Sequence, residues 1–139
     1  MIHSLNDLIN ENFDFNSGLE AGREFFPYTV NLKQSQSVIW NTGWCAVNEE
    51  TLRQNILQIS YEFYLNSQRI PTDGNFAIRW GPNGSHYCHY QYTILGDWPV
   101  GTNIITTVKV FKSDINDGVT RSPFPAGKKV IQYTASISP

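Results

Sequence analysis

The chain has 139 residues and a formal net charge of −2, with 14% aromatic and only 16% charged residues. This length fits one domain with its own core, and abundant aromatic residues beside few charged ones are typical of β-strands. The basic residues are scattered, with Lys128 and Lys129 as the only adjacent pair. The sequence therefore predicts no nucleic-acid partner and no anionic membrane surface, both of which need clustered basic side chains.

Residues 1–23 are predicted to form an extension that stands outside the core. They lack the basic start, apolar stretch and small-residue cleavage site of a signal peptide, and no run in the chain approaches the roughly 18 apolar residues of a membrane-spanning helix. Ser4 is a suitable N-cap for a short helix that carries Leu5 and Leu8. Asn10–Gly22 is rich in Asn, Asp, Ser and Gly, which favours a loop. The main domain is expected to span 24–139.

Two strands and a helix follow this extension. Apolar and polar residues alternate from Phe26 to Leu32, which is the period of a half-buried strand. Pro27 places this strand at a sheet edge or lies near the start of the strand. A second strand is expected over 38–46. Asn48 is a good N-cap and predicts a helix of two to three turns over 48–56.

The clearest strand signal is the stretch LQISYEFYL at 57–65. Its apolar positions are Leu57, Ile59, Tyr61, Phe63 and Leu65. This strict period of two predicts a central strand with the odd-numbered side buried.

Four more strands are predicted in the second half of the chain, at 76–80, 86–95, 103–112 and 129–137. Turn signals rich in Gly and Pro separate them. On 86–95 we expect the face that carries Cys88 to point inward. About seven strands with one short helix after the second strand indicate an all-β fold, either an antiparallel two-sheet sandwich or a barrel.

The closing half of the chain resembles an immunoglobulin-like β-sandwich accessory domain of bacterial surface and secreted proteins. The residues that carry the resemblance are Trp98–Gly101, the long strand that follows them, Pro125–Gly127, and Tyr133 on the last strand. The turn at 66–71 after the central strand is also similar. In that family a glycine often precedes a long outgoing strand, and the final strand carries a tyrosine. The resemblance covers 24–139 and favours the sandwich. It implies a secreted or cell-envelope location and a role in protein contact, display or spacing.

The two cysteines, Cys45 and Cys88, have two interpretations. A disulfide between them implies an oxidising compartment, whereas free thiols would act as small buried apolar groups. We expect the disulfide, with both cysteines facing inward. This chain differs from antibody-type domains in two ways. Its Trp44 directly precedes the first cysteine, and His86 stands two residues before the second cysteine, where antibody-type domains carry a tyrosine. No antibody-like function is implied.

Metal binding has weak support in the sequence. The candidate zinc ligands are His86, Cys88 and His89, with Cys45 and His3 as the nearest additions. Imidazoles that lie beside tyrosines without a metal are the preferred interpretation. Asp114–Gly118 resembles a calcium loop, but its ligand spacing is one residue short, so a turn with Gly118 at positive φ is expected. No metal or cofactor is predicted.

Four tryptophans raise the question of carbohydrate binding, since aromatic faces stack on sugars. Trp40 and Trp80 fall on inward-alternating positions and are expected in the core. Trp98 lies in a loop with Gly, Asp and Pro and is expected to be exposed. Together with Tyr64 and Tyr87 it forms the predicted ligand-binding platform.

No catalytic residue is predicted. The histidines have no Gly-x-Ser-x-Gly elbow beside them, and the carboxylates fall mainly in caps and turns. The first hypothesis is a non-catalytic extracellular or envelope module for protein contact, display or spacing. The second is a carbohydrate-binding module that uses loop aromatics, and the third is a small enzyme or an intracellular β-domain. A protein or glycan surface is the expected partner, and the oligomeric state is not indicated.

Overall fold

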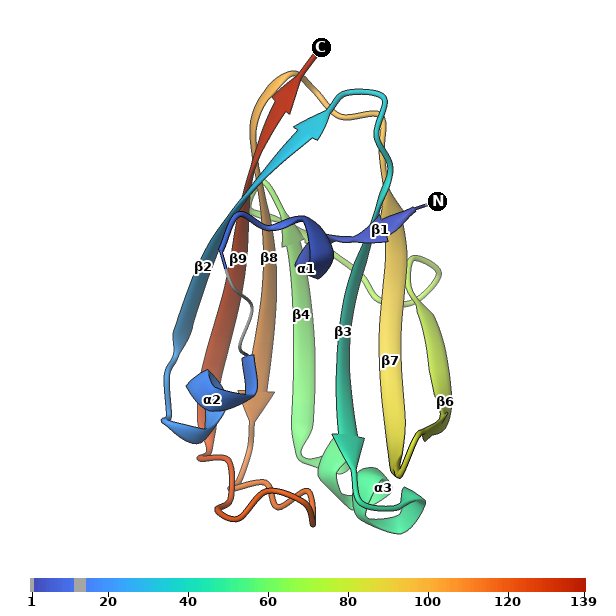
Figure 1. The fold of residues 1–139 in the computed structure, drawn as a ribbon, viewed down its shortest axis with the longest axis vertical. Coiled ribbons are helices and arrows are strands. Elements are labelled where there is room, and N and C mark those ends of the chain that lie inside the picture. Colours follow the sequence, from blue (N-terminus) through green and yellow to red (C-terminus); the bar gives the residue numbers. More distant parts are fainter. Residues whose placement is uncertain (1, 12–14) are drawn as a thin grey trace.

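The strands form two sheets that pack face to face (Figure 1) in a computed structural model that describes residues 2–11 and 15–139. The first sheet has the spatial order β1 (His3–Ser4), β3 (Val38–Ala46), β7 (His86–Leu95) and β6 (Ala77–Asn83). The second has the order β2 (Phe25–Lys33), β9 (Gly127–Ser138), β8 (Gly101–Phe111), β4 (Ile59–Leu65) and β5 (Gln68–Ile70). The helices of the described part are α1 (Leu5–Leu8), α2 (Phe15–Glu20) and α3 (Glu49–Leu57). The predicted all-β, two-sheet class is confirmed.

Both sheets are mixed, so the prediction of an antiparallel fold with about seven strands is wrong in detail. β1 pairs with β3 in parallel, and β2 pairs with β9 in parallel over its whole length. The remaining pairings are antiparallel. A period of two shows that a segment is a strand, but the same alternation serves either direction of pairing.

The core lies between the two sheets and is rich in aromatic side chains. The ring of Trp40 packs edge-on against Phe63, with 5.3 Å between ring centroids. Trp44 packs in the same way against Phe111 and Phe124. The indole N–H of Trp40 donates to the hydroxyl of Thr107 at 2.9 Å, which removes the cost of burying an unpaired donor.

The N-terminal segment belongs to the core, contrary to the expectation that it stands apart. Leu5 and Leu19 are both fully buried. The backbone N–H of Asn10 donates to the carbonyl of Thr29 at 2.8 Å, which holds the segment along the outer edge of β2. The loop predicted at 10–22 contains α2, while residues 12–14 of that prediction lie outside the described residues.

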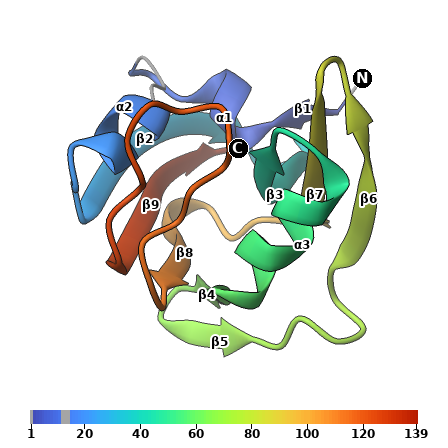
Figure 2. The same ribbon diagram turned by 90° about the horizontal axis from the view of Figure 1, so that it is seen from below.

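Helix α3 begins as predicted but ends later. The side chain of Asn48 accepts a hydrogen bond from the backbone N–H of Thr51 at 2.8 Å, which confirms it as the N-cap. Leu57 is the last helical residue and is 74% exposed, so the central strand begins at Ile59 rather than Leu57. The helix lies across one end of the space between the sheets (Figure 2). In the part of the chain that the structure describes, no helix has both the length and the apolar character needed to cross a membrane.

Candidate functional site

Cys45 and Cys88 form a disulfide, as predicted. They lie directly opposite each other on β3 and β7, with Cα atoms 4.1 Å apart. The inward orientation expected for them is wrong. Trp44 and Ala46 fill the core side of β3, so Cys45 between them points to the outer face. The bond therefore joins neighbouring strands of one sheet and does not link the two sheets as in antibody-type domains.

The core-facing side of β7 is also the opposite of the expected one. His89, which pairs with the buried Trp44, and Gln91 are buried, whereas Tyr92 and Ile94 are exposed. Both sides of this strand carry aromatic or apolar residues, so counting them does not identify the buried side. Burial lowers the pKa of His89 and favours its neutral imidazole.

The predicted ligand-binding aromatics do not make one platform. Trp98 is 3% exposed and its indole N–H donates to the carbonyl of Gln36 at 2.8 Å, so the expectation that it is exposed is wrong. Tyr64 is half-buried on the second sheet, and Tyr87 packs against the core from the first. The better exposed tryptophan is Trp80, at 37%, which was expected in the core.

The sequence segments considered for metals have other roles. Cys88 is bonded to Cys45, and the alternation along β7 places His86 and His89 on opposite faces. Within the described ranges, no three His, Cys, Asp or Glu side chains cluster as metal ligands would. Gly118 adopts a φ of 78°, as the predicted turn requires.

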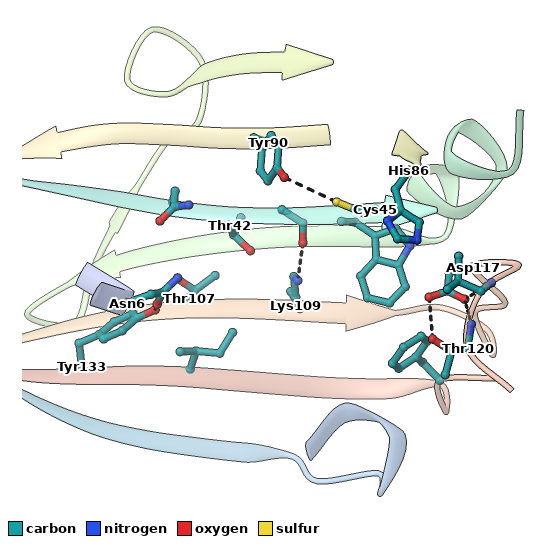
Figure 3. Close-up of a pocket in the computed structure, with 16 residues that line it drawn as sticks. Asn6, Thr42, Cys45, His86, Tyr90, Thr107, Lys109, Asp117, Thr120 and Tyr133 are labelled. Atoms are coloured by element: carbon teal, nitrogen blue, oxygen red, sulfur yellow. Dashed lines mark hydrogen bonds between the residues drawn. The ribbon is translucent and has the colours of Figure 1, made fainter. Parts of the chain in front are cut away.

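A cleft of about 440 Å³ lies between the edge of β3 and the inner face of the second sheet (Figure 3). We call it the edge cleft. One wall is the β3 backbone from Asn41 to Cys45, and the floor side chains are Thr107 and Lys109 of β8 with Ile131 and Tyr133 of β9. Asn6 of α1 lies at one end, and the Asp117–Thr120 turn lies at the other.

Within the described residues, the edge of β3 is covered at its two ends, and the cleft lies between them. At the first end, β1 pairs with Val38 and Ile39 and then turns away into α1. At the second end, the backbone N–H of Val47 donates to the carbonyl of Asp117 at 2.8 Å. Between these contacts, residues 40–46 have β7 on one side and no strand of the described chain on the other.

The backbone groups that face the cleft follow from the pairing of β3 with β7. A Cα separation of 4.1 Å at Cys45 and Cys88 is typical of a non-hydrogen-bonded pair, so the amide groups of Cys45 point away from β7. Every second residue has this orientation, which adds Gly43 and Asn41. The carbonyl of Gly43 accepts a hydrogen bond from Lys109 Nζ at 3.0 Å, in agreement with this geometry. The backbone N–H groups of Asn41, Gly43 and Cys45, which also face the cleft, have no backbone partner among the described residues.

Lys109 is the charged group of the cleft floor and is only 1% exposed. Its Nζ lies 5.5 Å from the ring centre of Trp44 and 5.7 Å from that of Tyr61. Burial disfavours the ammonium and lowers the pKa of Lys109 to about 7. The side chain therefore joins the two sheets through a bond whose donor changes charge near neutral pH.

Tyr133 completes the polar part of the floor. Its hydroxyl donates to the side-chain oxygen of Asn6 in α1. Burial raises the pKa of Tyr133 far above its usual range, so the phenol stays protonated and acts as a donor. The N-terminal segment thus forms one end of the cleft through this contact.

The sequence interpretation missed Lys109 and the open edge. Lys109 falls on the same side of β8 as Ile105, Thr107 and Phe111, at every second position. This spacing was a signal that Lys109 faces inward. The open edge has no such signal, because it depends on how short β1 is.

Comparisons of the chain with protein-family models, curated proteins and solved structures gave no match.

Proposed function

We propose that this chain is a non-catalytic, immunoglobulin-like binding module of a secreted or envelope protein. It holds an extended segment of a partner protein by adding that segment as a strand to the open edge of β3. The observation that carries the proposal is the backbone from Asn41 to Cys45, which forms a wall of the edge cleft and has no strand of the described chain beside it. In strand addition, main-chain hydrogen bonds supply affinity and flanking pockets supply specificity.

The dimensions of the edge suit a short peptide. Residues 40–46 extend over roughly 20 Å at about 3.3 Å per residue, which accommodates about five residues of an added strand. Alternate side chains of that strand would point between the sheets, over Lys109 and Ile131. The others would point outward beside Tyr90 and His86, which also line the cleft.

The other sheet edges offer less. β5 has three residues. The edge of β2 is already occupied, since the carboxylate of Glu11 accepts from the backbone N–H of Thr29 at 3.0 Å. β6 is open but carries Arg79 and Pro82, and charges and prolines are features that discourage pairing at edge strands.

The extracellular part of the proposal is supported by the disulfide. Disulfides persist in oxidising compartments and are rare where thiols are kept reduced. The bond also stabilises the wall of the cleft, because it connects Cys45 of the edge strand to β7 behind it.

Substitution of Asn41 by proline is expected to weaken peptide binding at least tenfold. Its N–H faces the cleft, so proline removes a donor to the added strand while the β3–β7 hydrogen bonds remain. The measurement is the Kd of ten-residue peptides selected from a random display library against the folded domain, with hydrogen exchange at Gly43 and Cys45 with and without peptide.

Two variants serve as controls for this experiment. Asn41→Ala keeps the backbone N–H and loses only the side-chain contact with Ser4, so it should retain binding. Ile78→Pro removes an N–H from the free edge of β6 and should have no effect. Selected peptides that leave the Gly43 and Cys45 amides unprotected, or a library that yields no binder, would refute strand addition at β3.

A further inference from the structure

We propose that the bound segment carries an acidic side chain, Asp or Glu, that points into the edge cleft and pairs with Lys109. This inference rests on the proposed strand addition and specifies the chemistry of the partner. It starts from the hydrogen bond between Lys109 Nζ and the carbonyl of Gly43, because the partner strand needs that same carbonyl.

The ammonium of Lys109 and an added strand compete for one acceptor. The backbone groups of Gly43 point toward the cleft, so an N–H of the added strand is expected to donate to its carbonyl. In the free protein Lys109 Nζ occupies this carbonyl at 3.0 Å. Inward-pointing charges of this kind protect edge strands against unwanted pairing. A strand that offers nothing to Lys109 has to displace a charge-assisted bond.

A carboxylate on the bound strand resolves this competition. It replaces the neutral carbonyl as the acceptor for the ammonium, and charge-assisted bonds with ions on both sides are stronger than those with a neutral acceptor. The Gly43 carbonyl is then free for the strand. Lys109 is only 1% exposed, and an ion pair with a buried group is attracted more strongly than one in water.

Among the described residues, the charges near Lys109 favour an anion. From β9, Lys129 stands directly opposite Lys109 and is equally buried. From β4 and β3, the neighbours are the rings of Tyr61 and Trp44.

The remaining titratable groups of the cleft do not oppose an anion. The carboxylate of Asp117 lies at one end, where it accepts hydrogen bonds from the backbone N–H groups of Val119 and Thr120 and from the hydroxyl of Thr120. From β7, His86 and Tyr90 line the cleft on the outer side of the sheet. Tyr133 on the floor carries a protonated hydroxyl. A carboxylate that enters over the middle of the floor therefore meets Lys109 first, whereas a lysine or arginine meets like charge.

The test uses three capped peptides, acetyl-Thr-Val-Xaa-Val-Thr-amide, in which Xaa is Glu, Gln or Lys. At pH 6 the Glu peptide should bind at least tenfold more tightly than the Gln peptide, and the Lys peptide should bind most weakly. The preference for Glu over Gln should decrease between pH 6 and pH 9, because the amine of Lys109 loses its proton in that range. Titration calorimetry gives the Kd values, and hydrogen exchange at Gly43 locates the peptide.

Variants separate the two proposals. Lys109→Met should make the Glu and Gln peptides equal, whereas Lys128→Met, which removes an exposed lysine from β9, should leave the preference intact. Equal binding of the Glu and Gln peptides to the wild-type domain, with Gly43 protected, would overturn the acidic preference and leave strand addition standing. Failure of all three peptides to bind or to protect Gly43, together with failure of the library selection, would overturn both. The wild-type comparison decides the matter even where the Lys109 variant fails to fold.

Discussion

Removal of the Cys45–Cys88 disulfide is expected to lower the free energy of unfolding by about 4 kcal/mol. The two cysteines are separated by 43 positions, and the loop they close contains α3, β4, β5 and β6. Closing a loop of this length restricts the unfolded chain, and the chain-entropy model converts that restriction into stability. The effect is a large fraction of the 5–15 kcal/mol that is typical of a folded domain.

The measurement is urea unfolding of three samples: the oxidised wild type, the reduced wild type, and the double variant Cys45→Ala, Cys88→Ala. In the oxidised protein the sulfur of Cys45 lies 3.6 Å from the hydroxyl of Tyr90. The reduced wild type keeps this sulfur atom, and the double variant loses it. Similar losses in both samples would assign the effect to the covalent link. A loss below about 1 kcal/mol would contradict the entropic account.

The buried faces of β2 and β9 were predictable from local periodicity in the sequence. The alternation from Phe26 to Leu32 and the final alternation from Lys129 to Ile137 place the same residues inside as the structure does. The cap at Asn48 was predictable because capping needs only a short polar side chain before a helical run. Each of these signals lies within about ten residues of chain.

The features that depend on distant segments were not predictable. Ile78 and Trp80 alternate like core residues, but they lie on the edge strand β6 and remain exposed. Trp98 lies in a loop rich in turn residues, yet it is buried. Its indole N–H donates a hydrogen bond to the backbone carbonyl of Gln36, which is distant in the sequence. The edge cleft is open because β1 covers only two residues of β3, which no local pattern encodes.

The stability of the wild type, compared with that of Lys109→Met, is expected to rise with pH above about pH 7. The pKa of Lys109 is about 7 in the folded protein, against a usual value of 10.5. At a pH between these two pKa values, Lys109 is protonated in the unfolded chain and deprotonated in the folded chain. Stability increases with pH wherever the unfolded state binds more protons. The slope approaches 1.4 kcal/mol per pH unit, so the gain from pH 7 to pH 9 is roughly 2 to 3 kcal/mol.

Below pH 7 Lys109 is protonated in both the folded and the unfolded state. It therefore does not change the free energy of unfolding with pH there, and the full cost of burying its charge lowers the stability. The variant Lys109→Met, which fills similar space without a charge, is therefore expected to be at least as stable as the wild type at pH 6. Urea unfolding of both proteins at pH 6, 7, 8 and 9 gives the difference in slope, and Lys128→Met should follow the wild-type curve. Parallel curves for the wild type and Lys109→Met would show that the ammonium stays charged in the fold. The competition at the Gly43 carbonyl would then persist at every pH, and the acidic preference of the edge cleft would lose its pH dependence.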